Sequence, residues 1–275
     1  MAYEYELMRV TVADGVAEAV VDNPPINLIT LRLYRELATF AEEVMFDDEV
    51  RVVVLRSANP DFFLAHFDVA AILRFPTDGE PALQQELSPN HAMTERFRTM
   101  PKVTICEIAG RVGGGGAELA ASCDMRFGAL GRTVLCQMEV PLGIMPGGSG
   151  TQRLPHLVGR SRALEIVLGG DDVDADTLER WGWLNRALPA EELRPFVDRL
   201  ASRIASFPAV ALTQAKAAML AAEADPTPGL FEEAYRFQVT LRDPLSTQRM
   251  QAFLERGGQT PEGEARVGAL GAELG

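Results

Sequence analysis

The chain has 275 residues, and its 26 basic side chains against 39 acidic ones give a formal net charge of −13. This balance argues against a nucleic-acid-binding surface, which needs clustered positive charge to displace counterions from phosphates. No basic-then-apolar segment opens the chain, and no apolar run approaches the ~20 residues that cross a bilayer. With 47% hydrophobic residues, the chain has ample material for a core. We therefore expect a globular cytoplasmic protein, most simply an enzyme, without nucleic acid or membrane as a partner.

Cysteine usage fits the same compartment. The three cysteines are odd in number, lie among apolar neighbours and show no metal-ligand spacing (Cys106, Cys123 and Cys136). We expect buried, reduced thiols and no metal centre.

The first part of the chain predicts the order strand, strand, helix, strand. Two alternating segments flank the turn Asp14-Gly15, and from Thr30, which can cap a helix, the apolar spacing becomes helical. A short apolar run without alternation then predicts a strand covered on both faces. The four expected elements are 4–12, 16–21, a helix from 30 to about 45, and 52–55.

A similar rhythm follows in the middle of the chain. The segment 75–100 is rich in proline and predicts a loop with a short helix at about 84–98. Beyond it we expect a buried strand, a glycine-rich stretch, a helix and two further strands, at 103–106, 113–116, about 117–123, 125–129 and 133–135.

Past Pro189 the pattern becomes almost entirely helical. Ala-rich helices are expected at 190–206, 208–224 and 228–243, with a last helix from about residue 245. The Gly- and Glu-rich residues from 257 onward predict a poorly ordered tail.

Four consecutive glycines, Gly113 to Gly116, separate a predicted buried strand from a predicted helix. Such glycines let the backbone approach a ligand closely and leave the first helical N–H groups free. With the helix dipole, these N–H groups suit an anion or a developing oxyanion. A nucleotide site is not indicated, because Glu118 stands where the dinucleotide fingerprint needs its third glycine, and the later turn 143–149 lacks the lysine of a phosphate-binding loop.

Two glutamates follow the glycine run. Glu118 falls in the first turn of the predicted helix, where glutamate is ordinarily stabilising, and Glu139 follows in an apolar context. A buried carboxylate is unfavourable unless it is paired, hydrogen-bonded or used. Two carboxylates in one apolar pocket can act as base and acid, so Glu118 and Glu139 beside an oxyanion site predict a proton-transfer apparatus.

Two motifs around these residues resemble the signature of the enoyl-CoA hydratase/isomerase (crotonase) family. The first is the glycine-rich segment 108–124, and the second is the segment 139–154. Weaker similarity extends over 23–256, nearly the whole chain.

The resemblance implies an α/β fold, a ClpP/crotonase-like spiral of ββα units with a helical C-terminal trimerisation region. On this basis, residues 1–190 form the spiral core with an acyl-coenzyme A site, and residues 191–275 form the helical oligomerisation region. The implied partners are an acyl-coenzyme A thioester substrate and further copies of the chain, in a homotrimer or hexamer. Coenzyme A belongs to the substrate, so no separate cofactor is implied.

The resemblance also assigns the site. In the family the thioester oxygen lies between two backbone N–H groups, which match Gly115 and, in the segment Phe63-Leu64-Ala65-His66-Phe67-Asp68, Ala65. The glutamates match Glu118, which would activate a water for addition at Cβ of a trans-2-enoyl thioester, and Glu139, which would protonate Cα. The neighbouring positions implied to contact substrate are His66, Phe67, Asp68 and Gly114.

Two positions depart from the family pattern. His66, followed by a bulky phenylalanine, stands where the family has glycine, so it could narrow the pocket or add a hydrogen bond. Near the C-terminus, lysines that meet coenzyme A phosphates in relatives are missing, which leaves Arg249 and Arg256 as candidates for those contacts.

Three functions stay open at this point. A hydratase is favoured because both glutamates are present, whereas family isomerases typically keep only the one that matches Glu139. Because of His66, another acyl-CoA reaction remains an alternative: isomerisation, dehalogenation, decarboxylation or thioester hydrolysis. The third is a non-catalytic binding or assembly protein, which the intact Glu118, Glu139 and Gly115 argue against.

Overall fold

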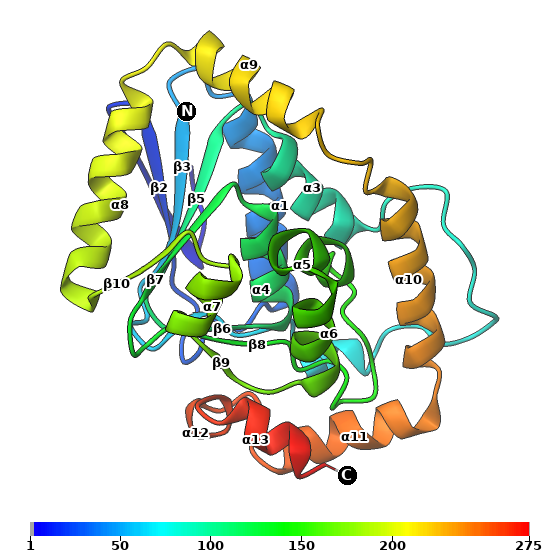
Figure 1. The fold of residues 1–275 in the computed structure, drawn as a ribbon. Helices are drawn as coiled ribbons and strands as arrows, with labels where there is room; N and C mark the ends of the chain where they lie inside the picture. The colour runs from blue at the N-terminus through cyan, green and yellow to red at the C-terminus, as the bar shows by residue number, and fades with distance from the viewer. Residues whose placement is uncertain (1–2, 275) are drawn as a thin grey trace.

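The computed structural model describes residues 3–274, in which two β-sheets are surrounded by helices (Figure 1). The larger sheet of this range has six strands in the order β1-β2-β3-β5-β7-β10. Its β1–β2 pair is antiparallel, and the other neighbours run parallel. The strands are β1 (Met8–Ala13), β2 (Val16–Val21), β3 (Val52–Ser57), β5 (Val103–Ile108), β7 (Met125–Ala129) and β10 (Arg186–Leu188).

Strand β3 shows how both faces of this sheet are covered. Val53 and Leu55 join the apolar cluster that contains helix α1 (Leu31–Met45), whereas Val52 and Val54 pack with helix α8 (Ala190–Ala205). Successive strand side chains point to opposite faces, so a doubly covered strand needs an uninterrupted apolar run. The prediction for this segment is confirmed, and Figure 1 shows α8 and α1 on opposite sides of the sheet.

Helix α1 begins where the sequence predicts. The Thr30 side chain accepts a hydrogen bond from the Leu33 N–H at 3.3 Å. The apolar face predicted from the spacing is fully buried at Leu37, Phe40 and Val44.

The smaller sheet carries the site. Its order is β4-β6-β8-β9, and β4, β6 and β8 run parallel. Ligands bind beyond the carboxyl ends of parallel strands, where the segments that follow neighbouring strands meet. Here those segments are 65–68, 114–118 and 137–139, which contain most of the predicted site residues. The strands are β4 (Phe62–Leu64), β6 (Arg111–Gly113), β8 (Val134–Cys136) and β9 (Val173–Asp174).

A repeated unit links the two sheets. Strands β3, β5 and β7 lie in the larger sheet, and the strand that follows each of them, β4, β6 or β8, lies in the smaller one. A helix comes after each pair, so the chain winds as a spiral of ββα units, as the resemblance implies. The helices of this part are α2 (Val69–Ile72), α3 (Pro89–Thr99), α4 (Gly114–Ser122), α5 (Gly150–Val158), α6 (Arg160–Gly169) and α7 (Ala175–Trp181).

The helical character predicted after residue 189 is confirmed. Helix α8 packs on the core sheet, α10 runs beside α5, and α11 to α13 lie along the end of the molecule at the bottom of Figure 1. An oligomerisation role for residues 191–275 stays a prediction. The last helices are α9 (Ala209–Leu220), α10 (Thr227–Leu241), α11 (Pro244–Glu255), α12 (Pro261–Glu264) and α13 (Val267–Ala272).

The tail expected to be poorly ordered instead forms α12 and α13. Val267 and Leu270 pack in one apolar cluster with Met250 and Phe253 of α11. The glycines and glutamates of the segment concealed this short apolar spacing, so the prediction from composition was wrong.

Two element boundaries also differ from prediction. β1 begins at Met8 rather than at residue 4, because the N–H groups of Glu6 and Leu7 donate to the Glu36 carboxylate instead of a strand partner. The helix expected from residue 84 begins at Pro89, capped by the Ser88 side chain. All three cysteines are buried and free, as predicted. Within residues 3–274, no helix combines the length and apolar character that a membrane crossing requires.

Candidate active site

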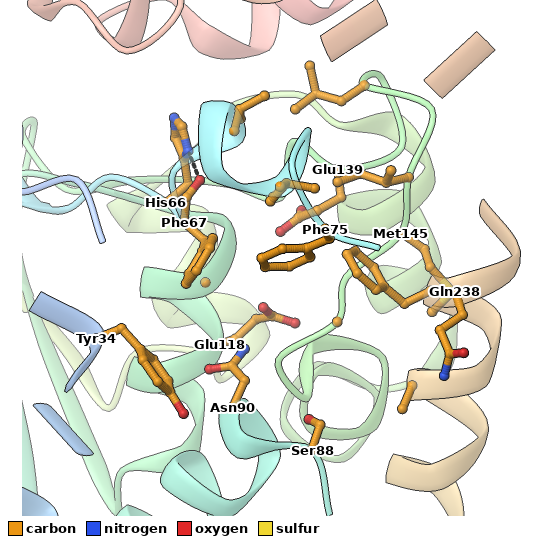
Figure 2. Close-up of a pocket in the computed structure, with 18 of the residues that line it drawn as sticks. Tyr34, His66, Phe67, Phe75, Ser88, Asn90, Glu118, Glu139, Met145 and Gln238 are labelled. Carbon is orange, nitrogen blue, oxygen red and sulfur yellow. Dashed lines mark hydrogen bonds between the residues drawn. The ribbon is translucent and has the colours of Figure 1, made fainter. Parts of the chain in front are cut away.

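A cavity of about 370 Å³ opens beyond the carboxyl ends of the small sheet. Glu118 and Glu139 both line it, together with Gly115, His66 and Phe67. Figure 2 shows the Glu118 side chain entering this space from below and that of Glu139 from above. The cavity thus brings Glu139 together with Glu118 and Gly115, which are neighbours in the sequence.

Glu118 is held firmly by the backbone of a neighbouring loop. Its Oε1 accepts the N–H groups of Gly148 and Gly150, each at 2.8 Å, and the residue is 3% exposed. Burial, together with repulsion from Glu139 and Glu233, raises its pKa well above the ordinary value, against the two N–H bonds. The helix starts at Gly114, earlier than expected, so Glu118 lies beyond its first turn. It is therefore a cavity residue rather than a stabiliser of the helix terminus.

Glu139 lies in the segment after β8, beyond Gln137 and Met138, and faces the same cavity. Its Oε1 accepts a hydrogen bond from Gln137 Nε2 at 3.2 Å, whereas its buried Oε2 finds no partner among the described residues. Burial raises the pKa of Glu139 to about 7, although the nearby His66 acts to lower it. This carboxyl can therefore exchange a proton near neutral pH.

The two carboxyl groups act as one titrating unit. Burial and like charge disfavour two carboxylates in one apolar cavity, so the pair retains a proton around neutral pH. The backbone N–H bonds favour charge on Glu118, and the unpartnered oxygen favours the protonated form of Glu139. The cavity therefore has a protonatable carboxyl group on either side of one space.

Gly114 to Gly116 of the glycine run begin α4, and Gly113 ends β6, so the run is not a loop between the two elements. The initial N–H groups of α4 have no partner within the helix, and Gly115 lines the cavity. Gly114 has a φ of +40°, and a Cβ there would lie 2.8 Å from the His66 Cβ and 3.0 Å from Glu139 Oε1. Glycine is therefore required at Gly114 for both its backbone conformation and its close neighbours.

The assignment of Ala65 to an oxyanion hole is contradicted by the structure. The Ala65 N–H donates to the Asn27 carbonyl at 3.3 Å, and Ala65 lines a separate space of only about 10 Å³. Pairing with the chain near residue 27 therefore occupies the Ala65 N–H group that the motif match had assigned to the oxyanion hole.

Phe67 provides the available N–H group instead. In the isolated parallel bridge between Ile29 and Phe67, Ile29 bonds to the His66 carbonyl and the Asp68 N–H, at 2.8 and 3.1 Å. This pattern turns the N–H of Phe67 to the opposite side. A Cβ placed on Gly115 would lie 3.6 Å from the Phe67 nitrogen, so the two backbone segments face each other at the cavity.

His66 and Asp68 serve the surrounding framework. The His66 ring is 3% exposed, with Nδ1 2.8 Å from the Phe67 carbonyl and Nε2 3.0 Å from Glu264 Oε1. Asp68, expected to contact substrate, caps α2 by accepting the Ala70 N–H at 2.9 Å, and it also accepts from Gln259 Nε2 at 3.0 Å.

Asn90 and Glu233 were missed from the sequence. Asn90 Nδ2 and Glu118 Oε2 both lie within 2.5 Å of the point that a Cβ on Gly148 would occupy, and Figure 2 shows the two side chains together. Glu233 of α10 is 1% exposed and lies 3.0 Å from His91 Nε2. In the sequence, Asn90 is marked only by its place after the capping Ser88 and Pro89. Nothing in the sequence distinguishes Glu233 from other acidic residues.

The rest of the cavity wall is largely apolar. Phe75, Leu142, Ile144 and Phe237 form much of it, and the ring centroids of Phe67 and Phe75 are 6.0 Å apart. Such a wall suits a hydrocarbon or aromatic group rather than a charged one. Within residues 3–274, no three potential metal-ligating side chains cluster.

The arginines proposed for coenzyme A phosphates make contacts within the chain. Arg249 Nη1 donates to the Pro141 carbonyl at 3.1 Å, and Arg256 donates to the Glu273 carbonyl. Their phosphate role stays a prediction.

Comparison with known proteins shows the family to which this α/β scaffold belongs. The model of the enoyl-CoA hydratase/isomerase family matches residues 11–262, so the chain belongs to this family.

Two curated relatives illustrate the match. The chain is 30% identical to the Bacillus subtilis (strain 168) protein YngF, provisionally named an enoyl-CoA hydratase/isomerase, over 84% of this chain and 87% of YngF. It is also 33% identical to the fatty acid oxidation complex subunit alpha of Shewanella sp. (strain W3-18-1), over 64% of this chain but 25% of that longer protein.

Solved structures give the same result. A Streptomyces avermitilis protein provisionally named an enoyl-CoA hydratase has a TM-score of 0.89 and 40% identity, covering 98% of this chain and 99% of that one. An enoyl-CoA hydratase of Bacillus anthracis has a TM-score of 0.72 and 27% identity, covering 91% and 97%. The spiral fold expected from the resemblance is thereby confirmed.

Proposed function

We propose that this chain is an enoyl-CoA hydratase that adds water across the trans-2 double bond of an acyl-coenzyme A thioester. The observation that carries the proposal is the pair Glu118 and Glu139, two buried carboxyl groups that face one cavity and together retain a proton. Hydration of a conjugated double bond needs one group to take a proton from water and another to protonate carbon, and this pair supplies both.

The backbone N–H groups of Phe67 and Gly115 are the donors for the thioester oxygen in this proposal. They replace the pair Ala65 and Gly115 expected from the sequence, because the Ala65 N–H is occupied. Donors aimed at this oxygen stabilise the enolate-like charge that develops when the double bond is attacked.

The proton movements balance within the pair. Glu118 takes a proton from water as the water oxygen bonds to Cβ, and Glu139 gives its proton to Cα. Proton transfer from Glu118 back to Glu139 restores the starting state. The reaction needs no cofactor besides the coenzyme A of the substrate itself.

The apolar wall of the cavity favours an acyl group without charge.

Exposed apolar side chains favour self-association of the chain. Val210 and Met219 of α9 are 69% and 66% exposed, and burying such residues between copies is favourable. The family resemblance implies a homotrimer or hexamer, which sedimentation analysis measures directly.

The test follows loss of the conjugated enoyl-thioester absorbance with crotonyl-CoA and with medium-chain, branched and aromatic 2-enoyl-CoAs. Glu118→Gln and Glu139→Gln should each lower kcat by ~10²–10⁴. Unchanged rates in both variants would refute the two-glutamate mechanism. A wild-type protein that moves the double bond of 3-enoyl-CoAs but hydrates no 2-enoyl-CoA would instead be an isomerase.

A further inference from the structure

The turn before α12, together with α12 itself, is fastened to the segment that carries the Phe67 N–H. Gln259 accepts the Val69 N–H at 2.9 Å and donates to Asp68 at 3.0 Å. Glu264 Oε1 lies 3.0 Å from His66 Nε2 and accepts the Gln259 N–H at 2.9 Å. Residues 66–69 are thus held by a segment almost two hundred positions later in the chain, which we call the C-terminal clamp (residues 259–264).

The hydrogen-bond partners of His66 define its charge. Nδ1 faces the carbonyl oxygen of Phe67 and Nε2 faces the carboxylate of Glu264, and both partners are acceptors. Each ring nitrogen must then carry a proton, which makes the ring an imidazolium. Burial alone would lower the pKa of His66, but the charge and hydrogen bond of Glu264 raise it above the ordinary value.

The surroundings of this ring are acidic or apolar. Glu264 on α12 and Glu139 after β8 are the charged groups that act on it, and the Phe253 ring of α11 packs edge-on at 5.9 Å between centroids. The pKa of Glu264 is in turn lowered, despite its burial, by His66, by the Gln259 N–H and by Arg111. The result is a buried ion pair with further hydrogen bonds at both ends.

The His66 ring anchors the peptide group that follows Phe67, and Ile29 anchors the one that precedes it. The carbonyl of His66 accepts the Ile29 N–H at 2.8 Å, which holds the peptide group that contains the Phe67 nitrogen. The His66 ring bonds to the next carbonyl along the chain, as the dashed line in Figure 2 shows. Both peptide groups that flank Phe67 are therefore anchored.

We propose that His66 is a positioning residue whose charged ring, anchored by Glu264, holds the Phe67 carbonyl and thereby the backbone that presents the Phe67 N–H to the thioester oxygen, and keeps a buried cation beside Glu139. This inference rests on the proposed hydratase function. It also assigns a role to the clamp, since Glu264 supplies the counter-charge without which the buried ring would lose its proton.

The first test reads the charge of His66 without turnover. Nitrogen NMR of the histidine rings in the intact protein should show His66 with both nitrogens protonated at pH 7.5, with its signals assigned by their loss in His66→Asn. Glu264→Gln should convert the ring to the neutral form. A neutral His66 in the wild-type protein overturns the proposal, whatever the enzyme activity.

The second test is kinetic and uses Glu264→Gln with the exposed neighbour Glu262→Gln as its matched control. We expect the Glu264 variant to lose roughly tenfold in kcat, less than the 10²–10³ that removal of an oxyanion donor costs, with KM changed by less than about twofold. The high-pH limb of kcat should move upward, because Glu139 loses the cation that lowers its pKa.

The outcomes separate this proposal from the function beneath it. Unchanged kcat and pH profile in both the Glu264 and the His66 variants, with an active wild type, overturn the positioning role alone. A His66→Asn protein that keeps the bond to the Phe67 carbonyl but loses the charge should show the same upward pH shift. A wild type inactive on every enoyl-CoA overturns the proposed function and this role with it.

Discussion

Glu118 and Glu233 accept alternate backbone N–H groups of one loop. Of the four consecutive N–H groups from Gly148 to Thr151, Glu118 Oε1 accepts the first and third, each at 2.8 Å, and Glu233 accepts the second and fourth, at 2.6 and 2.9 Å. The loop, which includes a left-handed φ of +97° at Ser149, is therefore clamped from both sides. Glu233 belongs to α10, so a helix far along the chain fixes the loop that donates hydrogen bonds to Glu118.

Removing the charge of Glu233 should destabilise the protein. Glu233→Gln leaves only one acceptor oxygen for the N–H groups and His91, so the free energy of unfolding should fall by about 1–3 kcal/mol. Chemical denaturation at pH 7 measures this change. Glu232→Gln is the matched control, because its partner Arg236 is exposed and such surface pairs contribute little. An equal fall in the free energy of unfolding of both variants would contradict this role of Glu233.

The pH dependence of kcat should follow the Glu139 proton. Because the pKa of Glu139 is raised to about 7 and the proposed reaction uses its protonated form, loss of this proton should limit kcat above that pH. Above it, kcat should fall about tenfold for each pH unit. A steady-state profile between pH 5.5 and 9 with a saturating enoyl-CoA tests this. A rate that does not fall above pH 7 would contradict protonated Glu139 as the acid.

Glu139→Gln should raise the free energy of unfolding at high pH, although it lowers kcat. A carboxyl whose folded pKa is raised binds more protons in the folded than in the unfolded state, so its contribution is lost as pH rises through about 7. Glutamine has no proton to lose. The variant should therefore be more stable than wild type at pH 8, by roughly 2 kcal/mol, and about equal at pH 4.5. Thermal unfolding at the two pH values provides the measurement.

Gly114→Ala should impair both stability and catalysis. The left-handed φ of Gly114 and the contacts of a Cβ with His66 and Glu139 predict a loss of at least tenfold in kcat and about 1–2 kcal/mol in stability. Gly131→Ala separates the two causes, since Gly131 has a φ of +69° but open space around it. The control should lose stability alone. Loss of activity in both variants would show that backbone strain, not proximity to the site, is responsible.

The central site could be predicted because its chemistry is local in the sequence. Glu118 follows a glycine run that ends a strand, and Glu139 stands in an apolar stretch where an unused carboxylate would be costly. The strands could be predicted for a similar reason, since the apolar run at β3 can be accommodated only when both faces are covered.

The wrong assignment of Ala65 has a different origin. Which N–H faces the cavity depends on the bridge between Ile29 and Phe67, and a shift of two residues in such a pairing leaves no trace in a local pattern. The partners of the buried histidines were equally out of reach. His66 and Glu264 are 198 positions apart, and His91 and Glu233 are 142 apart. Only the folded chain brings these pairs together.

The complete site can form only after the C-terminal clamp has been synthesised. A ribosome releases the sheets, the glycine run and Glu139 well before residues 259–264, so the nascent protein holds its glutamates for some time without the counter-charge for His66. The same dependence makes the clamp a point of vulnerability. A protease that cuts between α11 and α12 would break the covalent link between the preceding chain and the segment that carries Glu264, the partner of His66.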